Sequence, residues 1–138
     1  MFLLILLVCI QWTLSSQTLK VSITGLRNNS GNIVLAFYNT EKAFEDETPL
    51  FTKVESKATV VNHILTLTYN GLKSGVYGIV ILDDENNNSK MDFGWILPEE
   101  GFGFSNYYHT GMLKPKLSKF SFTLTNETKA VEIKVKYM

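Results

Sequence analysis

The sequence predicts an all-β fold, an antiparallel sandwich of the immunoglobulin-like or prealbumin-like kind with about seven strands. Three observations predict it. Short segments in which every second residue is apolar recur along the chain, and clusters of glycine, asparagine and serine separate them. No segment repeats its apolar residues with the period of an amphipathic helix.

The amino-terminal residues have the layout of a secretory signal peptide. Residues 1–10 are almost wholly apolar, and residues 11–16 are polar or small. The apolar run is shorter than the roughly 20 residues that a membrane-spanning helix needs. We therefore expect removal of residues 1–16, and a single domain over residues 17–138 that is secreted or periplasmic and has no transmembrane segment.

Composition narrows the chemistry and the partners. The only cysteine, Cys9, lies in the predicted signal peptide, so the mature domain would have neither a disulfide nor a thiol nucleophile. The chain has 13 basic and 13 acidic residues, and its net charge is zero. This balance gives no sign of an electrostatic grip on nucleic acid or on an anionic membrane, so we expect no nucleic-acid partner.

The first two predicted strands are the clearest. Every second residue is apolar in residues 18–24 and again in residues 32–38. Between them, the run from Arg27 to Gly31 contains residues that favour a chain reversal. We predict that the two strands form a hairpin and that residues 40–49 follow as a crossing loop.

The remaining strands are predicted with unequal clarity. Residues 76–82 are nearly all apolar, as a central strand covered on both faces requires, and should form the spine of the core. Four further strands complete the prediction, a weak one at residues 50–61 and clearer ones at residues 64–69, 119–125 and 130–137.

The run from Asp83 to Asp92 follows the predicted central strand and has the spacing of a calcium loop. Calcium prefers six to eight oxygen ligands, and short side chains on alternate residues of a curling loop can all point inward. The predicted metal ligands are the side chains of Asp84, Asn86, Asn88 and Asp92 and the backbone carbonyl of Lys90.

The loop departs from an EF-hand at two positions. Ser89 stands where a glycine normally makes the sharp turn, and Trp95 stands where the bidentate glutamate would be. Few of the predicted ligands are charged, which favours weak binding unless Glu85, Glu99 or Glu100 folds back to contribute. The alternative is a metal-free turn in which the asparagine amides cap their own backbone.

Three segments together resemble the DUF2141 family of secreted bacterial proteins, namely Gly75 to Val80, Asp84 to Asp92 and Pro98 to Asn106. The resemblance covers nearly all of the mature chain. It implies a signal peptide and a β-sandwich but no known reaction. Members typically read His-Asp-Glu-Asn-Gly-Asn-Gly at the loop, where this chain has Asp83, Asn87 and Ser89 at the first, fifth and seventh places.

Aromatic residues in and after the loop form the predicted ligand-binding surface. Flat rings bury a large area at low entropic cost, so they suit recognition of carbohydrate or protein. The predicted contact residues are Trp95, Phe102, Phe104, Tyr107, Tyr108 and His109. The alternative is that these rings form a small satellite core that pins the long loop.

No catalytic residue is predicted. Ser105 is not flanked as G-x-S-x-G, and adjacent Glu99 and Glu100 point in different directions on an extended chain. We expect a secreted or periplasmic binding module for an unidentified ligand, carbohydrate or protein, with calcium as the cofactor. Two alternatives stay open, a structural envelope or adhesion component and a metal-dependent enzyme that uses Asp84, Glu99, Glu100 and His109.

Overall fold

The structure of the protein is a computed structural model that describes residues 17–88 and 100–138. These residues form eight strands and two short helical turns. The strands are β1 (Thr18–Thr24), β2 (Asn32–Tyr38), β3 (Phe51–Ser56), β4 (Leu65–Asn70), β5 (Gly75–Asp84), β6 (Phe102–Phe104), β7 (Phe122–Leu124) and β8 (Lys129–Lys134). The helical turns are α1 (Glu41–Glu45) and the 3-10 turn η1 (Leu117–Lys119). Within these ranges, no helix is both long and apolar enough to cross a membrane.

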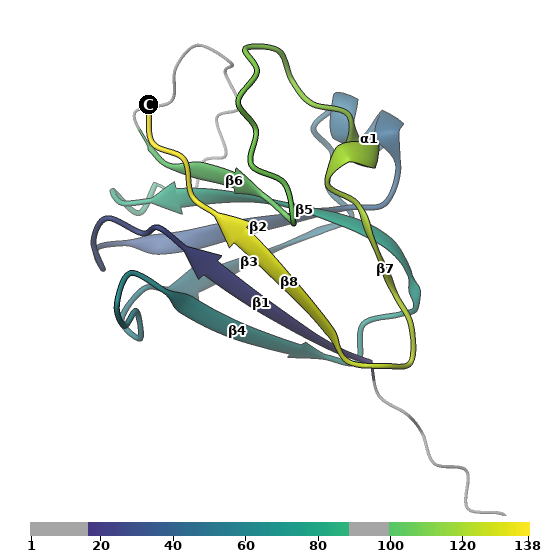
Figure 1. The fold of residues 1–138 in the computed structure, drawn as a ribbon, viewed down its shortest axis with the longest axis horizontal. Helices are drawn as coiled ribbons and strands as arrows, with labels where there is room; N and C mark the ends of the chain where they lie inside the picture. The colour runs from purple at the N-terminus through teal and green to yellow at the C-terminus, as the bar shows by residue number, and fades with distance from the viewer. Residues whose placement is uncertain (1–16, 89–99) are drawn as a thin grey trace, which may run out of the picture.

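The strands form two sheets that pack face to face (Figure 1). One sheet has the order β4-β1-β8, and the other has the order β3-β2-β5-β6. The short β7 pairs with the start of β5, and β6 pairs with its second half. This arrangement confirms the predicted all-β sandwich, in which β5 is a central strand.

One strand pair departs from the antiparallel prediction. β8 runs parallel to β1, with Val131 beside Val21, whereas the other strand pairs in the described residues are antiparallel. β1 and β8 lie at opposite ends of the domain sequence. No tight turn joins them, so nothing forces their directions to oppose each other.

The predicted hairpin between the first two strands is wrong. β1 pairs with β4 and β8, whereas β2 pairs with β3 and β5. Residues 25–31 therefore cross from one sheet to the other instead of reversing the chain within one sheet. Val21 in β1 and Leu35 in β2 both belong to the main core, so the two strands contribute to the same core from different sheets.

The main core fills the space between the two sheets. β5 contributes Ile79 and Ile81 to this core, while Val80 belongs to a second cluster on the outer face of the sheet. All three side chains are fully buried. The predicted coverage of the central strand on both faces is therefore confirmed.

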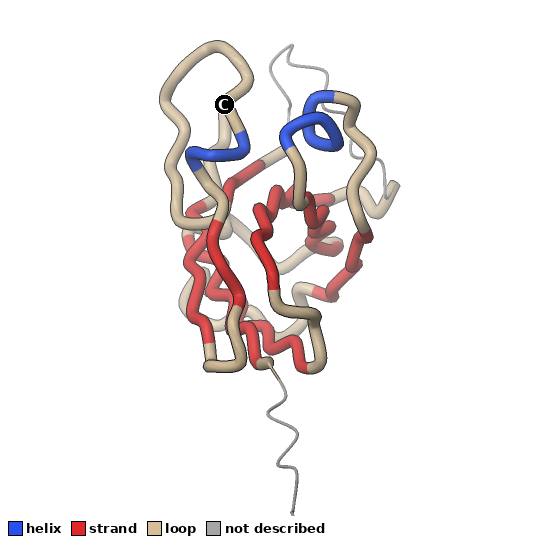
Figure 2. The backbone as a smooth tube through the Cα atoms, turned by 90° about the vertical axis from the view of Figure 1, so that its right-hand side faces the viewer, coloured by secondary structure: helices blue, strands red, loops and turns tan. Residues whose placement is uncertain are grey.

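The second, smaller core covers the outer face of the five-stranded sheet. The rings of Phe44, in α1, and Phe120, next to η1, pack edge to face with centroids 5.1 Å apart, and Phe104 joins them. The predicted crossing loop at residues 40–49 thus contains one helical turn, which Thr40 caps by accepting a hydrogen bond from the backbone N–H of Ala43. Figure 2 shows both helical turns at the same end of the sandwich as the carboxyl terminus.

Three predicted strands are shorter than expected, and one observed strand is missing from the prediction. The weak strand at residues 50–61 is reduced to β3, the strand at residues 130–137 ends at Lys134 in β8, and the strand at residues 119–125 is reduced to β7, because η1 takes up Lys119. The unpredicted strand is β6, whose three residues include a glycine and are too few to show a period of two.

Candidate functional site

β5 ends in two adjacent carboxylates, Asp83 and Asp84, and both residues are fully buried. Successive side chains of a strand point to opposite faces, so the two carboxylates enter different surroundings. A buried charge is costly unless it is paired or hydrogen-bonded. The partners of each carboxylate therefore indicate its role.

Asp83 belongs to a closed polar network. Lys57 Nζ lies 2.6 Å from Asp83 Oδ1, and both side chains are fully buried. The Tyr137 hydroxyl donates to Asp83 Oδ2 at 2.5 Å, and Lys57 also donates to Asn28 Oδ1 at 2.9 Å. Burial, together with this hydrogen bond to Asp83, raises the pKa of Tyr137. Asp83 therefore ties together the loop before β2, the end of β3 and the carboxyl-terminal segment.

Glu85 is held by Arg27 in a bidentate ion pair. Arg27 Nε lies 2.6 Å from Glu85 Oε1, and Nη2 lies 3.0 Å from Oε2. The guanidinium also stacks over the Tyr137 ring, 4.4 Å from its centroid. The hydrogen bonds from Arg27 are the main cause that lowers the pKa of Glu85. Glu85 thus anchors the start of the loop to the neighbouring crossover.

In the turn after β5, the side chains of two predicted metal ligands accept hydrogen bonds from the same backbone N–H. The backbone N–H of Asn88 donates to Asp84 Oδ1 at 3.1 Å and to Asn86 Oδ1 at 3.2 Å. Asn87, between them, has a left-handed backbone with φ of 57°. The oxygens of Asp84 and Asn86 therefore converge. The other two predicted metal ligands, Lys90 and Asp92, lie outside the described residues.

This turn is compatible with both interpretations of the loop. Side-chain oxygens that accept a nearby N–H are typical of a metal-free Asx turn. A carboxylate also has about four lone-pair sites, so an aspartate that accepts a backbone N–H can bind a cation as well. In residues 17–88 and 100–138, no three His, Cys, Asp or Glu side chains are grouped so that they could hold a metal ion. A full calcium shell would need further ligands.

Glu100 returns to this cluster from a distant part of the sequence. The backbone N–H of Asn86 hydrogen-bonds to its carboxyl group, and burial followed by repulsion from Asp84, Asp83 and Glu85 raises its pKa. Its Oε1 is buried and has no hydrogen-bond partner in the part of the chain that the structure describes. Of the three glutamates that the sequence suggested as helpers, Glu85 is held by Arg27, Glu99 lies outside the described residues, and Glu100 lies beside the loop.

Gly31 allows the crossover to pack against the end of β5. Its φ is 76°, a left-handed conformation that favours glycine. A Cβ at this position would clash with the carbonyl oxygen of Asp84 and would lie 2.8 Å from the Cα of Glu85. The backbone around the candidate site is therefore fixed by a contact that only glycine permits.

The predicted aromatic surface is divided between buried and exposed rings. Phe104 is fully buried in the second core, and Phe102 and Tyr107 are partly buried against it. The ring of Tyr108 is 46% exposed, and Lys134 Nζ lies 5.2 Å from its centroid. Trp95 lies outside the described residues.

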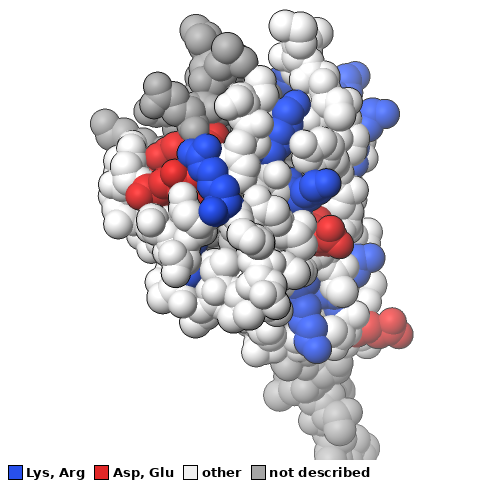
Figure 3. Space-filling view, turned by 60° about the vertical axis from the view of Figure 1, so that its left-hand side comes forward, with Lys and Arg blue, Asp and Glu red and all other residues white. Residues whose placement is uncertain are grey.

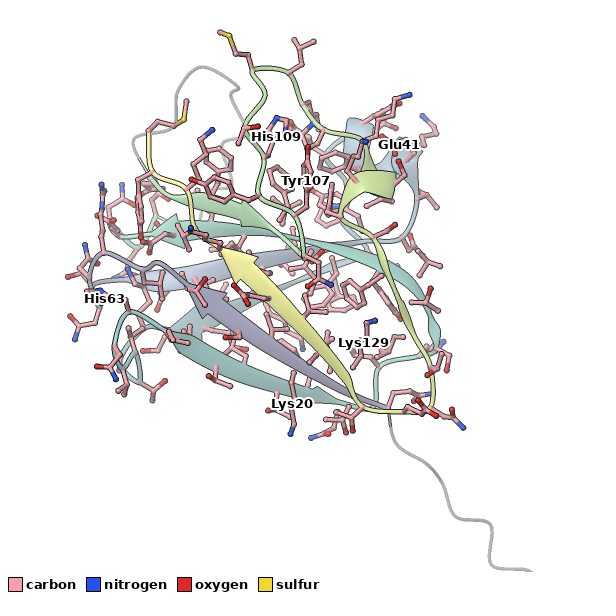
Figure 4. The ribbon with its side chains drawn as sticks, in the orientation of Figure 1. Lys20, Glu41, His63, Tyr107, His109 and Lys129 are labelled. Carbon is pink, nitrogen blue, oxygen red and sulfur yellow. The ribbon has the colours of Figure 1, made fainter. Side chains whose placement is uncertain are left out.

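His109 is nearly buried and holds its own loop together. Its Nε2 lies 2.6 Å from the carbonyl oxygen of Leu113, and its Nδ1 lies 3.4 Å from the Tyr107 hydroxyl. A carbonyl only accepts, so Nε2 carries a proton and donates to it. The ring also packs edge to face on Phe104, with centroids 5.9 Å apart. Figure 4 shows Tyr107 and His109 at the end of the sandwich near Glu41.

Sequence reasoning missed the basic and aromatic residues that hold the candidate site in place. Arg27, Lys57 and Tyr137 come from three segments far apart in the chain, and no local pattern marks them as partners of one cluster. Figure 3 shows acidic side chains gathered on the left of one face next to basic ones.

The comparison with known proteins agrees with the resemblance of the loop and its flanks. Residues 21–132 match the sequence profile of a family described as "Uncharacterized protein conserved in bacteria (DUF2141)". No curated protein and no solved structure matches this chain. The matched range runs from β1 to β8, so it includes both sheets and the loop after β5. The chain belongs to the DUF2141 family.

Proposed function

We propose that this protein is a secreted or periplasmic binding module in which calcium orders the loop that begins at Asp84. The observation that best supports the proposal is Glu100 Oε1, a buried carboxylate oxygen without a hydrogen-bond partner among the described residues. Burying such an oxygen is unfavourable unless something compensates its charge. A cation next to Glu100 would give this oxygen a partner and would offset the repulsion from Asp84.

The donor atoms fit a hard cation. Asp84 and Glu100 offer carboxylate oxygens, and Asn86 and Asn88 offer amide oxygens, which are the ligand types that calcium prefers. There is no thiol and no histidine in this group, so a soft transition metal is a poorer match. The sequence adds the Asp92 carboxylate and the Lys90 carbonyl, both outside the described residues.

The charges of the cluster also favour a cation. Lys57 forms an ion pair with Asp83, and Arg27 forms one with Glu85. The carboxylates of Asp84 and Glu100 repel each other, which contributes to the raised pKa of Glu100. A divalent cation between them would offset this repulsion.

The loop would support a contact surface for an unidentified ligand, carbohydrate or protein. Tyr108 offers an open ring face, and Phe102 and Tyr107 offer partly open ones. Phe104 packs beneath them in the second core and would hold the surface in shape. Trp95 is proposed as a further contact from the sequence alone. Secretion is proposed from residues 1–16, whose apolar run is typical of a signal peptide.

The test is a thermal melt of the purified protein with and without calcium. A ligand that binds only the native state at 100 times its Kd stabilises it by about 2.7 kcal/mol, so the melting temperature should rise by about 10 °C in a domain of this size. Magnesium at the same concentration should shift the midpoint less, because it requires a smaller and more regular shell. The absence of any shift at roughly 10 mM calcium, a concentration that saturates even weak extracellular sites, would refute the calcium proposal.

Conservative variants identify the site. Asp84→Asn keeps the oxygen that accepts from Asn88 but removes the charge, and Glu100→Gln does the same for the buried carboxylate. Both variants should fold and should lose most of the calcium-induced shift. Glu45→Gln is the matched control, since Glu45 is exposed on α1 and should leave the shift unchanged. An undiminished shift in Glu100→Gln would show that calcium binds elsewhere.

A further inference from the structure

The loop between β6 and η1 carries two neighbouring apolar side chains in full contact with solvent. Met112 is 95% exposed and Leu113 is 83% exposed, the two largest values among the exposed large apolar residues of the described chain. The loop projects from the end of the sandwich that carries α1 and η1 (Figures 1 and 2). Residues of this size usually retreat from water when the chain allows it.

Met112 and Leu113 form the tip of this loop, and they cannot fold back onto the protein because the backbone on both sides of the tip is anchored. Nε2 of His109 donates to the Leu113 carbonyl oxygen at 2.6 Å, which closes the loop around Gly111. A Cβ on Gly111 would lie 2.9 Å from the His109 ring, so the backbone packs directly on the imidazole. Lys114 Nζ donates to the Phe44 carbonyl oxygen at 2.7 Å and fixes the far side of the tip. The exposure of the tip is therefore built into the loop.

Positive charge surrounds this tip. Residues 101–126 contain no Asp or Glu, and the segment that follows the tip contains Lys114, Lys116 and Lys119. Two further lysines come from the end of the chain. Lys134, the last residue of β8, lies over the Tyr108 ring, and Lys136 Nζ donates to the His109 carbonyl oxygen at 3.1 Å.

α1 and the two residues after it contain four acids, Glu41, Glu45, Asp46 and Glu47. Glu47 lies 3.7 Å from Lys114, Glu41 accepts from the backbone N–H of Leu117 at 2.8 Å, and Asp46 forms an ion pair with Lys42. In Figure 3, lysine and arginine side chains lie below the uncharged top of the molecule and over the rest of this face, and one basic group lies beside the acidic group on the left. Although the net charge of the chain is zero, its acidic residues are absent from residues 101–126. Zero net charge therefore does not exclude attraction of this end of the protein to an anionic membrane.

We propose that this loop is a membrane-docking tip that binds the surface of an anionic lipid bilayer. Met112 and Leu113 enter the boundary between headgroups and acyl chains, and the exposed Lys116 and Lys119 face the lipid phosphates. Tyr108, next to the tip, has the amphipathic ring that favours this interface. The proposal goes beyond the calcium-ordered loop and does not depend on it.

A bilayer fits the tip better than a protein partner does. A stable protein interface buries about 800 Å² on each side, whereas two side chains on a narrow, convex loop offer a small part of that area. A lipid surface is soft and closes around a convex apolar tip, and its negative headgroups match the lysines at the base. Both the convex shape of the tip and the positive charge around it therefore favour a lipid bilayer.

The first test is cosedimentation of the purified protein with vesicles. One set contains phosphatidylcholine alone, and the other contains phosphatidylcholine and phosphatidylglycerol in equal parts. The protein should bind the anionic vesicles at least about tenfold more tightly, and added salt should weaken this binding. No binding to the anionic vesicles, or equal binding to both sets, would refute the proposal.

Matched variants separate the tip from the rest of the surface. Replacing Met112 and Leu113 together by Ser, in Met112→Ser/Leu113→Ser, should weaken binding to anionic vesicles about tenfold or more, because it removes the inserted apolar area. Val61→Ser is the control, since Val61 is also exposed, at 67%, but lies in the turn before β4. Equal losses in the tip variant and the control would refute the tip as the docking site.

A second pair of variants, equal in net charge, tests whether the lysines near the tip contribute to membrane binding. Lys116→Glu and Lys20→Glu change the total by the same amount, but Lys20 lies on β1 at the opposite end of the molecule from His109 (Figure 4). Lys116→Glu should reduce binding severalfold, and Lys20→Glu should reduce it little. The reverse order would contradict docking through the tip.

A fluorescent label reports insertion directly. Met112→Cys, made together with Cys9→Ser so that only one thiol is present, carries a polarity-sensitive dye at the tip. Its emission should shift to the blue on addition of anionic vesicles, whereas the dye on Val61→Cys in the same background should not respond. If the tip variant instead abolishes a concentration-dependent dimer in solution and the label ignores vesicles, the occupant is a second copy of the chain and the lipid proposal is wrong.

Discussion

Lys57 and Asp83 form a fully buried ion pair at the base of the candidate calcium loop, with 2.6 Å between Nζ and Oδ1. Tyr137 and Asn28 complete the polar contacts of the pair. The carboxylate that faces this network is the immediate neighbour of Asp84, the first predicted metal ligand. The network therefore holds the backbone from which the loop departs, while Asp84 points to the opposite face.

Removing one partner of this pair should be strongly destabilising. Lys57→Met leaves the Asp83 charge buried without its cation, which costs about 3–5 kcal/mol of unfolding free energy in comparable pairs. Chemical denaturation with urea measures the loss. The double variant Lys57→Met/Asp83→Leu should recover part of it, since no charge is then stranded. A loss below about 1 kcal/mol for the single variant, the value of an exposed pair, would contradict the buried pairing.

The pH dependence of stability should reveal the Glu100 carboxyl. Burial, with repulsion from Asp84, Asp83 and Glu85, raises its pKa in the native state. The native protein therefore holds this proton more tightly than the unfolded chain does. Without calcium, its stabilising contribution is complete below the ordinary glutamate pKa of about 4.3 and is lost as the pH rises through the raised value.

Glu100→Gln isolates that contribution. In calcium-free buffer, the unfolding free energy of the wild type should fall relative to that of the variant as the pH rises from the acidic range towards neutrality. Calcium should reverse the order at neutral pH, because only the wild-type carboxylate offers a full charge to the ion. Parallel pH profiles of the two proteins would show that the Glu100 pKa is not raised.

A pair of glycines separates close packing from backbone strain. Gly31 and Gly71 both have φ of 76°. A Cβ on Gly31 would meet the backbone of Asp84 and Glu85, whereas one on Gly71 would meet nothing within 4 Å. Gly71→Ala should cost about 1–2 kcal/mol from the left-handed backbone alone.

Gly31→Ala should cost clearly more than Gly71→Ala and should also weaken any calcium-induced rise in melting temperature, because the loop base must move. Urea denaturation and melts with calcium measure the two effects. Equal losses in the two variants would show that the crossover does not pack tightly on the end of β5.

Local periodicity predicted the strands well where one face is buried. The predicted ranges 18–24 and 32–38 coincide with β1 and β2. Burial on alternate positions leaves a direct trace in the sequence of β1, whereas residues 33–38 of β2 are all buried. Strand pairing left no such trace. Val21 and Leu35 carry equally apolar faces, and these faces suit both a hairpin and two sheets in contact.

As with the strands, the local part of the candidate site was predictable from the sequence, and the part that depends on the tertiary fold was not. Asp84, Asn86 and Asn88 meet because alternate residues of a tight turn share one side, which is a local rule. Lys57 and Glu100 join the cluster only through the tertiary fold, so no local sequence pattern shows that they contact it. The sequence suggested Glu100 as a helper, but only the fold brings its carboxyl to the loop.

Ser105 offers the last test, because its hydroxyl fills a gap in the partner strands of β5. β6 pairs with β5 at residues 80–82, and β7 pairs with it at residues 75–77. Between these segments, the Ile79 N–H donates to Ser105 Oγ at 3.0 Å, and this hydroxyl donates to the Phe120 carbonyl oxygen at 2.7 Å. The hydroxyl thus links β5 to the segment between η1 and β7.

Ser105→Ala should lower the unfolding free energy by about 1–3 kcal/mol, since it leaves a buried N–H and a buried carbonyl without this partner. Hydrogen exchange should show faster exchange of the Ile79 amide, which is a local signature that a general loss of stability does not produce. Ser118→Ala, at an exposed position of η1, is the control and should change the free energy by about 0.5 kcal/mol or less. An unchanged Ile79 exchange rate, relative to its β5 neighbours, would mean that another acceptor replaces the hydroxyl and that Ser105 does not bridge the gap.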